Sequence, residues 1–174
     1  MHLVLTQPIL QRLRNELGEA RRREIGGLLL GEHLEGETFR LAEVTIQRTG
    51  GSAVHFVRDP ALNQEQLDEF FSRTGADYTR FNYLGEWHSH PSFEPLPSST
   101  DINTMQSIVE DPAVGVNFLV LLLVRLTRWK QIKVSAMMFR ANMQPEFVQV
   151  STESDESDRK GWIAAKLLRI FSRR

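Results

Sequence analysis

The longest predominantly apolar run in the sequence, residues 116–124, limits the folds that the chain can adopt. It is about half as long as the roughly 20 residues that a helix needs to cross a bilayer, so it predicts a buried strand. A second apolar stretch, residues 25–31, is rich in leucine and glycine and predicts another central strand. We therefore expect a soluble domain built around a sheet, without insertion into a membrane.

Periodic patterns around these two runs predict a mixed α/β domain over residues 1–150. Apolar residues at helical spacing predict helices at residues 5–21, at residues 60–74 and from Ser98 or Ser99 onward. Alternating patterns predict further strands at residues 39–47, 83–90 and 131–140, with a short one at 147–150. A chain of 174 residues suits one domain of this kind.

The composition changes after residue 150. Residues 152–158 hold four acids in seven positions, and we interpret 151–158 as an acidic, solvated linker. Residues 159–174 carry six basic residues and no acid, with apolar residues on one helical face, and predict a basic amphipathic helix. Such a helix can pack on its own domain, on a partner or second copy, or weakly on an anionic membrane. Packing or dimerisation is the favoured interpretation.

Composition excludes several classes of site. The chain has no cysteine, which rules out a disulfide scaffold, a cysteine-ligated zinc finger and a thiol nucleophile. Lys and Arg total 21 against 22 for Asp and Glu, so the basic surplus typical of nucleic-acid-binding proteins is absent. Residues 1–8 lack the features of a secretory signal, and we expect a cytoplasmic protein.

A polar string after the strand predicted at 83–90 indicates a metal site. Side chains two residues apart on a strand point the same way, so His88 and His90 face together and can bind one ion. Pro91 ends the strand, and Asp101 lies in the first turn of the next helix, where it can supply an oxygen. Two nitrogens and one carboxylate leave a fourth position open, which is the pattern of a catalytic zinc.

Each part of this string also has an ordinary structural explanation. A histidine on a strand is most often a polar surface or core residue, and a Ser-x-x-Asp pair before an apolar run is most often a helix cap. The complete pattern, His88-x-His90-Pro91-x6-Ser98-x2-Asp101, fixes five identities. Background frequencies predict such a match in on the order of one chain in 10⁴–10⁵. The combination therefore favours a functional site.

The string resembles the signature of the JAMM metalloproteases, also called JAB or MPN domains, at all five fixed positions. That family also places a glutamate before a glycine-rich apolar strand, and Glu24 matches it in the segment Glu24-Ile25-Gly26-Gly27-Leu28-Leu29-Leu30-Gly31. The resemblance covers residues 3–150. It implies a single MPN (JAB)-like domain, with a curved mixed sheet flanked by helices.

The resemblance implies a zinc metalloprotease that hydrolyses amide or isopeptide bonds. His88, His90 and Asp101 would hold Zn²⁺, which lowers the pKa of water. Glu24 would be the general base and would pass the proton to the leaving amine. Ser98 would donate a hydrogen bond to the oxyanion, and capping the following helix is a compatible role for it.

Other residues carry weaker indications. Glu86 lies on the same strand face as the two predicted ligands and could orient one of them, although a surface carboxylate explains it equally well. His2, His33 and His55 lack the spacing of metal ligands, and we expect them to have no functional role. Trp87 points to the other face of the strand and is expected in the core.

The resemblance also suggests a substrate. Short prokaryotic members act on ubiquitin-like proteins, some of them in antiviral operons. We therefore favour cleavage after the C-terminal tail of a ubiquitin-like protein, in deconjugation or precursor processing, with conjugation-pathway enzymes as further partners and no nucleic acid. The tail could pair with a free sheet edge, and Phe70 or Phe71 could contact the substrate, although burial is commoner for such residues.

Two alternatives remain open at this point. One is a small-substrate metallopeptidase that releases an amino acid from a sulfur-carrier protein. The other is an MPN interaction module without catalytic activity. The intact set of predicted ligands and base disfavours the second alternative, and a failure to bind zinc would favour it.

Overall fold

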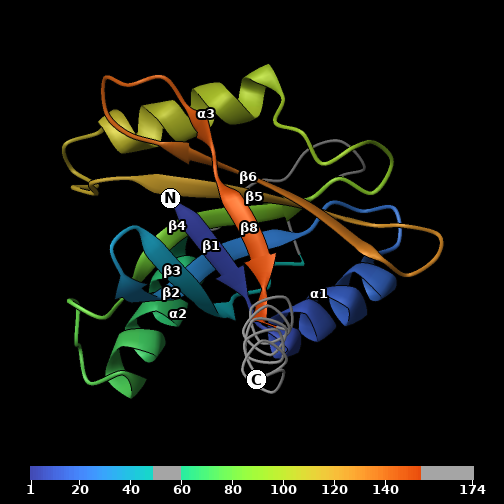
Figure 1. Ribbon diagram of the computed structural model, residues 1–174, viewed down its shortest axis with the longest axis horizontal. Helices are drawn as coiled ribbons and strands as arrows, with labels where there is room; N and C mark the ends of the chain where they lie inside the picture. Colours follow the sequence, from blue (N-terminus) through green and yellow to red (C-terminus); the bar gives the residue numbers. More distant parts are fainter. Residues whose placement is uncertain (49–59, 154–174) are drawn as a thin grey trace, which may run out of the picture.

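The described part of a computed structural model, residues 1–48 and 60–153, forms an eight-stranded mixed sheet with helices on both faces (Figure 1). The strands are β1 (His2–Leu5), β2 (Gly26–Glu35), β3 (Thr38–Val44), β4 (Phe81–Ser89), β5 (Leu119–Leu126), β6 (Ile132–Phe139), β7 (Glu146–Phe147) and β8 (Gln149–Thr152). The helices are α1 (Gln7–Ala20), α2 (Pro60–Arg73) and α3 (Ser99–Glu110). The predicted fold class is confirmed, whereas the predicted helix at 159–174 lies outside the described residues.

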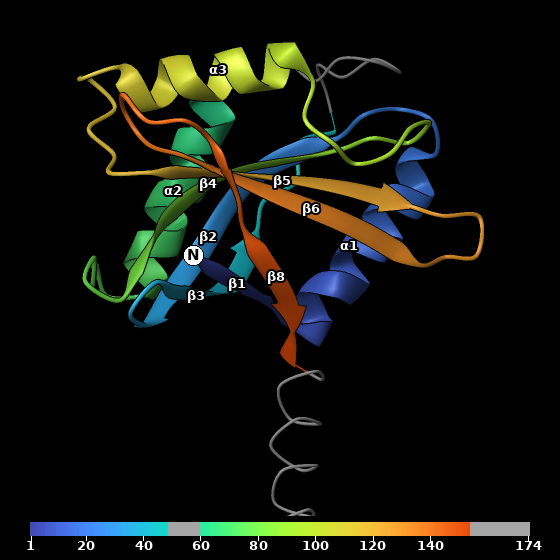
Figure 2. The ribbon, with the colours of Figure 1, turned by 45° about the horizontal axis from the view of Figure 1, so that its top comes forward.

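The apolar runs found in the sequence supply both faces of this sheet. Along β5, alternate side chains enter different clusters, so Leu121 packs on the side of α3 and Leu122 on the side of α1. Buried residues of the helices complete the two clusters: Leu13 of α1 packs in the cluster of Leu122 and Met105 of α3 in the cluster of Leu121. Figure 2 shows α1 on one side of the sheet and α3 on the other. Among residues 1–48 and 60–153, no helix is long and apolar enough to cross a membrane.

The sheet is strongly curved because its two edge strands are consecutive in the chain. The strand order is β7-β6-β5-β4-β2-β3-β1-β8, so β7 and β8 occupy opposite edges. A single residue, Val148, separates these two strands in the sequence. Its amide donates to the carbonyl of Ala136 in β6, at 2.9 Å. The edges must therefore lie close together, and the sheet curls toward a closed barrel.

The first strand, β1, has no counterpart among the predicted elements. It is four residues long, and three of them are buried, so no alternation is visible in the sequence. Its partners β3 and β8 run parallel to it and are far away in the chain. Thr6 then caps α1, with its side chain accepting from the amide of Ile9. Leu5 therefore ends a strand rather than beginning the helix.

Strand β4 depends on a glycine three residues before His88. The pairing of β2 with β4 shifts register between Leu29 and Leu30, which face Gly85 and Tyr83. Gly85 has a φ of 140°, and a Cβ atom added there would lie 2.1 Å from the backbone oxygen of Val120. Neither the dihedral nor the contact tolerates a side chain.

Replacing Gly85 by alanine is therefore expected to destabilise the protein by about 3 kcal/mol or more. Urea-induced unfolding measures the effect. The matched control is Gly18→Ala in α1, where an added Cβ meets nothing within 4 Å. This control should gain roughly 0.5–1 kcal/mol from higher helix propensity. An unchanged unfolding midpoint for Gly85→Ala would contradict the close packing and the register shift assigned to Gly85.

Candidate metal centre

Strand directions bring several predicted site residues to one end of the sheet. Strand β2 runs antiparallel to β4, with Gly26 opposite His88, while β5 runs parallel to β4. The amide of His90 donates to the carbonyl of Val124 at the end of β5. The start of β2 and the ends of β4 and β5 therefore meet, and α3 begins beside them. We call this the site end of the sheet.

The structure brings His88, His90 and Asp101 together at the site end. The two Nε2 atoms of the histidines lie 3.2 Å apart. Asp101 Oδ1 lies 3.3 Å from His88 Nε2, and Asp101 Oδ2 lies 4.0 Å from His90 Nε2. Ligand atoms about 2.0–2.1 Å from a tetrahedral zinc are about 3.3 Å apart. The donor set and its spacing therefore fit one zinc ion, and these atoms form a group that could hold a metal.

Asp101 is held in place by the first turn of α3. Ser98 is the N-cap residue, and its backbone amide and hydroxyl both donate to Asp101 Oδ2, each at 2.7 Å. The amide of Asp101 donates back to Ser98 Oγ at 3.2 Å, which completes a capping box. Burial raises the pKa of the Asp101 carboxyl, but hydrogen bonds with His88 and Ser98 outweigh burial and hold this pKa well below its usual range. Asp101 is therefore ionised and suited to a cation.

His90 is oriented by the loop that follows β4. Its Nδ1 lies 3.2 Å from the backbone carbonyl of Glu94, which identifies Nδ1 as the protonated nitrogen and leaves the lone pair on Nε2. The ring of Phe93 packs against the His90 ring, with centroids 4.4 Å apart. Burial lowers the pKa of His90 below its usual value. A neutral imidazole with a free Nε2 is the form that binds a metal.

Two cations hold the loop that orients His90. Arg125 Nη1 lies 2.7 Å from Glu94 Oε1, and Lys133 Nζ lies 3.2 Å from Glu94 Oε2. The hydroxyl of Ser135 also donates to the carbonyl of Pro95. Strands β5 and β6 thereby fix residue 94, whose carbonyl receives the His90 proton. No sequence pattern predicts this contact, because the functional atom of Glu94 belongs to the backbone.

Neutralising the Glu94 carboxylate, which pairs with Arg125 and Lys133, should weaken metal binding without unfolding the protein. For Glu94→Gln we expect about a tenfold loss of zinc affinity, the lower range for groups that orient a ligand. Competition with a chromophoric chelator measures it. The control is Glu37→Gln at the opposite end of the sheet, where Glu37 pairs with Arg140 and the N-terminus. Equal zinc affinities in Glu94→Gln and Glu37→Gln would contradict the positioning role.

Glu24 lies just before β2 and is buried, with 4% of its surface exposed. The backbone of Ser89 donates to the carbonyl of Ile25, so the β2–β4 pairing continues beyond Gly26. This register brings the backbone of Glu24 beside His90, one position past the last paired residues. The Glu24 backbone thus lies near the candidate metal centre, and a base role for its buried carboxylate stays a prediction.

Two further predicted site residues make contacts that bear on their roles. The Ser98 hydroxyl accepts from the amide of Asp101 and so performs the capping role. It also donates to Asp101 Oδ2, so donation to an oxyanion requires it to turn away from that carboxylate. Glu86 is half-buried, and its Oε1 lies 3.4 Å from the Tyr83 hydroxyl. A ligand-orienting role for Glu86 stays a prediction.

The remaining predictions for single residues concern packing. Trp87 is fully buried, as predicted, and its indole donates to the carbonyl of Thr45. Phe70 is buried, so it cannot contact a substrate, and Phe71 is half-buried against Tyr78. His2 and His33 lie apart from the candidate metal centre, since His2 contacts Ser151 and His33 contacts the carbonyl of Gly36. His55 lies outside the described residues.

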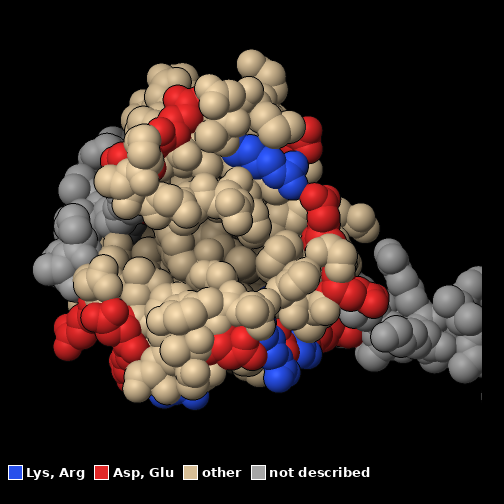
Figure 3. All heavy atoms as spheres, turned by 90° about the vertical axis from the view of Figure 1, so that its left-hand side faces the viewer, with Lys and Arg blue, Asp and Glu red and all other residues tan. Residues whose placement is uncertain are grey.

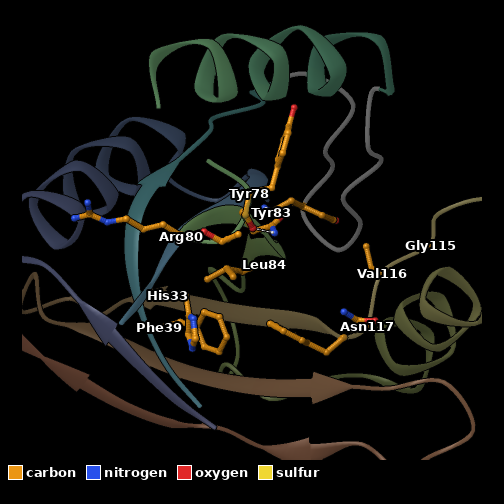
Figure 4. Close-up of a pocket in the computed structure, with 13 residues that line it drawn as sticks. His33, Phe39, Tyr78, Arg80, Tyr83, Leu84, Gly115, Val116 and Asn117 are labelled. Atoms are coloured by element: carbon orange, nitrogen blue, oxygen red, sulfur yellow. Dashed lines mark hydrogen bonds between the residues drawn. The ribbon is translucent and has the colours of Figure 1, made fainter. Parts of the chain in front are cut away.

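A separate pocket of about 240 Å³ lies at the opposite end of the sheet. Figure 3 faces that end and shows a hollow lined by uncharged side chains, with acidic and basic residues on its border. Figure 4 shows His33 stacked on Phe39 at one wall and Asn117 at another. Within the described ranges, the group of His88, His90 and Asp101 is the one that could hold a metal. The pocket is therefore distinct from the candidate metal centre.

Known proteins match both the sequence and the fold. A family model for prokaryotic homologs of the JAB domain matches residues 6–157, a range that includes Glu24 and the three metal-site residues. The solution structure of a Desulfitobacterium hafniense protein superimposes with a TM-score of 0.64 at 19% identity, covering 88% of this chain and 93% of that one. At this identity the likeness concerns the fold alone.

Three curated relatives match about half of the chain. The 26S proteasome non-ATPase regulatory subunit 14 of Dictyostelium discoideum is 36% identical over 96 residues, or 53% of this chain and 30% of the relative. Ubiquitin carboxyl-terminal hydrolase RPN11 of Saccharomyces cerevisiae is 31% identical over 84 residues, or 48% and 26%. A CD-NTase/cGAS isopeptidase of Vibrio cholerae is 30% identical over 94 residues, or 52% and 58%. The alignments thus span less than two thirds of each relative.

Proposed function

The chain belongs to the family of prokaryotic homologs of the JAB domain, and from this membership we propose that it is a zinc-dependent isopeptidase. Its proposed substrate is a ubiquitin-like protein, cut after the C-terminal tail. The observation that carries the proposal is the convergence of two imidazole nitrogens and an ionised carboxylate within 4.8 Å of one another. Three ligands leave one position of a tetrahedral zinc open, as in hydrolytic sites.

Zinc bound by these residues would polarise a carbonyl and lower the pKa of water toward about 7. The remaining roles fall to the chain itself. Glu24 takes a proton from the attacking water and delivers it to the leaving amine, so that the products are a carboxylate and an amine. Ser98 stabilises the oxyanion once its hydroxyl has turned from Asp101. No covalent intermediate is needed, consistent with the absence of cysteine.

The names of the relatives support the class of substrate. One is a ubiquitin carboxyl-terminal hydrolase and another an isopeptidase for CD-NTase/cGAS. The first name describes hydrolysis at the carboxyl terminus of ubiquitin, and the second describes hydrolysis of an isopeptide bond. Exposed apolar residues beside the centre suit an extended tail: Phe93 is 42% exposed and Leu96 57% exposed, on the loop that carries Glu94. These residues offer apolar contact next to the scissile bond.

The decisive experiment is intact-mass spectrometry of a ubiquitin-like protein carrying a C-terminal extension. It is incubated with the zinc-loaded chain and, in parallel, with the same chain after removal of zinc by a chelator. We expect a product that ends at the tail glycine only with zinc. A set of such substrates that all stay intact, although the chain binds zinc, would contradict the proposed substrate class.

A further inference from the structure

Two segments at the site end of the sheet are rich in basic residues. Residues 21–23 are three consecutive arginines that lie directly before Glu24. Every charged residue in 125–133, which spans the turn between β5 and β6, is basic, and two of them, Arg125 and Lys133, pair with Glu94. The whole chain has a formal net charge of −1, so this enrichment in basic residues is local. The border of the opposite end carries both signs (Figure 3).

The three arginines are exposed, and their backbone is fixed. The amide of Arg21 donates to the carbonyl of Leu17, and the amide of Arg23 donates to that of Ala20, so α1 ends in a defined turn. None of the three side chains forms an ion pair with residues 1–48 or 60–153. By contrast, Arg48 nearby is neutralised by Glu16 and Glu19. Within the part of the chain that the structure describes, the arginine triplet is therefore a set of cations without an acidic partner, on a turn held by backbone hydrogen bonds.

The position of this triplet relative to Glu24 indicates which part of a substrate it meets. In the proposed reaction Glu24 delivers the proton to the leaving amine, so the leaving group lies beside Glu24. In the sequence, Arg22 and Arg23 directly precede Glu24. We propose that the arginine triplet selects leaving groups whose residues next to the scissile bond are acidic. This inference rests on the proposed function and names its substrate class.

The turn between β5 and β6 carries further basic residues that can contact the same acidic segment. Arg128 lies over the ring of Trp129, 4.6 Å from its centroid, and Trp129 is 71% exposed. The amide of Lys130 donates to the carbonyl of Thr127, so the turn is ordered. Arginine and tryptophan are residues that dominate protein interfaces. Figures 1 and 2 both show this turn projecting on the same side of the molecule as the end of α1.

The test uses ubiquitin extended at its C-terminus by a peptide of about ten residues. Three versions differ only in charge: glutamate, glutamine or lysine alternates with serine. Binding to the Glu24→Gln chain is measured by fluorescence anisotropy, and cleavage by the wild-type chain by intact mass. We expect the acidic version to bind about three- to tenfold tighter than the glutamine version at low salt. The preference should decline as salt rises, since exposed charges are screened.

A matched pair of charge reversals separates position from net charge. Arg22→Glu should abolish the preference for the acidic version and favour the lysine version. Arg12→Glu changes the net charge equally, at an exposed position on α1, and should leave the preference intact. The double variant Arg22→Glu/Arg23→Glu should show a larger reversal than the single one.

Equal binding of the three versions, or equal losses in Arg22→Glu and Arg12→Glu, would overturn the inference. A single-stranded oligonucleotide is included as a probe. Tight binding of it that Arg22→Glu abolishes, together with no preference among the fusions, would assign the triplet to nucleic acid instead. If the acidic version binds as expected but none of the three is cut, the triplet binds acidic segments next to a ubiquitin tail, and the proposed reaction fails.

Discussion

The Asp101→Asn variant should lose both its zinc and its activity while keeping its fold. Asp101 supplies the only anionic ligand of the group at the site end. An amide oxygen is a weaker ligand than a carboxylate, and we expect zinc to bind at least about 100-fold less tightly, beyond the range for groups that only orient a ligand. Loss of about 4 kcal/mol of Lewis-acid stabilisation lowers the rate by about 10³-fold.

Asparagine is chosen because Asp101 has a second role. Its Oδ2 accepts the backbone amide of Ser98 in the capping box, and an amide oxygen can accept the same bond. Zinc content by metal analysis and the thermal midpoint of the metal-free protein separate the two roles. Asp111→Asn at the other end of α3 is the control, since among the described residues that carboxylate accepts from the nearby amide of Ala113 alone. A variant Asp101→Asn that retains stoichiometric zinc would refute the assigned ligand.

The sequence predicts those elements whose periodicity is set by one buried face. The helical spacing of Leu13 and Leu17 reflects their burial under the sheet, and Thr6 marks the start of α1. Strand β5 is predicted from its apolar run because both of its faces are buried. By contrast, β1 is too short to show a period, and its pairing with β8 joins chain positions about 147 residues apart. The closing curvature of the sheet depends on such long-range pairing and is not visible locally.

The candidate metal centre is predictable to the extent that it depends on side chains at fixed spacing. His88 and His90 share a strand face, and the capping box that positions Asp101 is itself a sequence pattern. The contacts that orient these residues cannot be predicted in the same way. Glu94 acts through its carbonyl, and Arg125 and Lys133 pair with its side chain from strands that lie much later in the sequence. Only the folded arrangement of β4, β5 and β6 reveals them.

The Glu24→Gln variant should separate chemistry from metal binding. Glutamine has nearly the same shape, so the buried position just before β2 can accommodate it. It cannot accept a proton, and loss of a general base typically lowers the rate by about 10²–10⁴-fold. Zinc affinity should change little, because Glu24 is not among the grouped ligand atoms. Cleavage of the extended ubiquitin-like substrate and chelator competition measure the two quantities on the same preparation.

The control for this variant is Glu35→Gln at the other end of the same strand, which removes a carboxylate far from the candidate metal centre. We expect it to cleave at the wild-type rate. A Glu24→Gln chain that binds zinc and cleaves within about threefold of the wild type would show that another group accepts the proton, because a missing general base costs far more than this. Loss of zinc in Glu24→Gln would instead make Glu24 part of the metal centre. The predicted result, full zinc occupancy with little turnover, requires Glu24 to act on the water and on the leaving amine. The proposed position of the arginine triplet beside the leaving group depends on this role of Glu24.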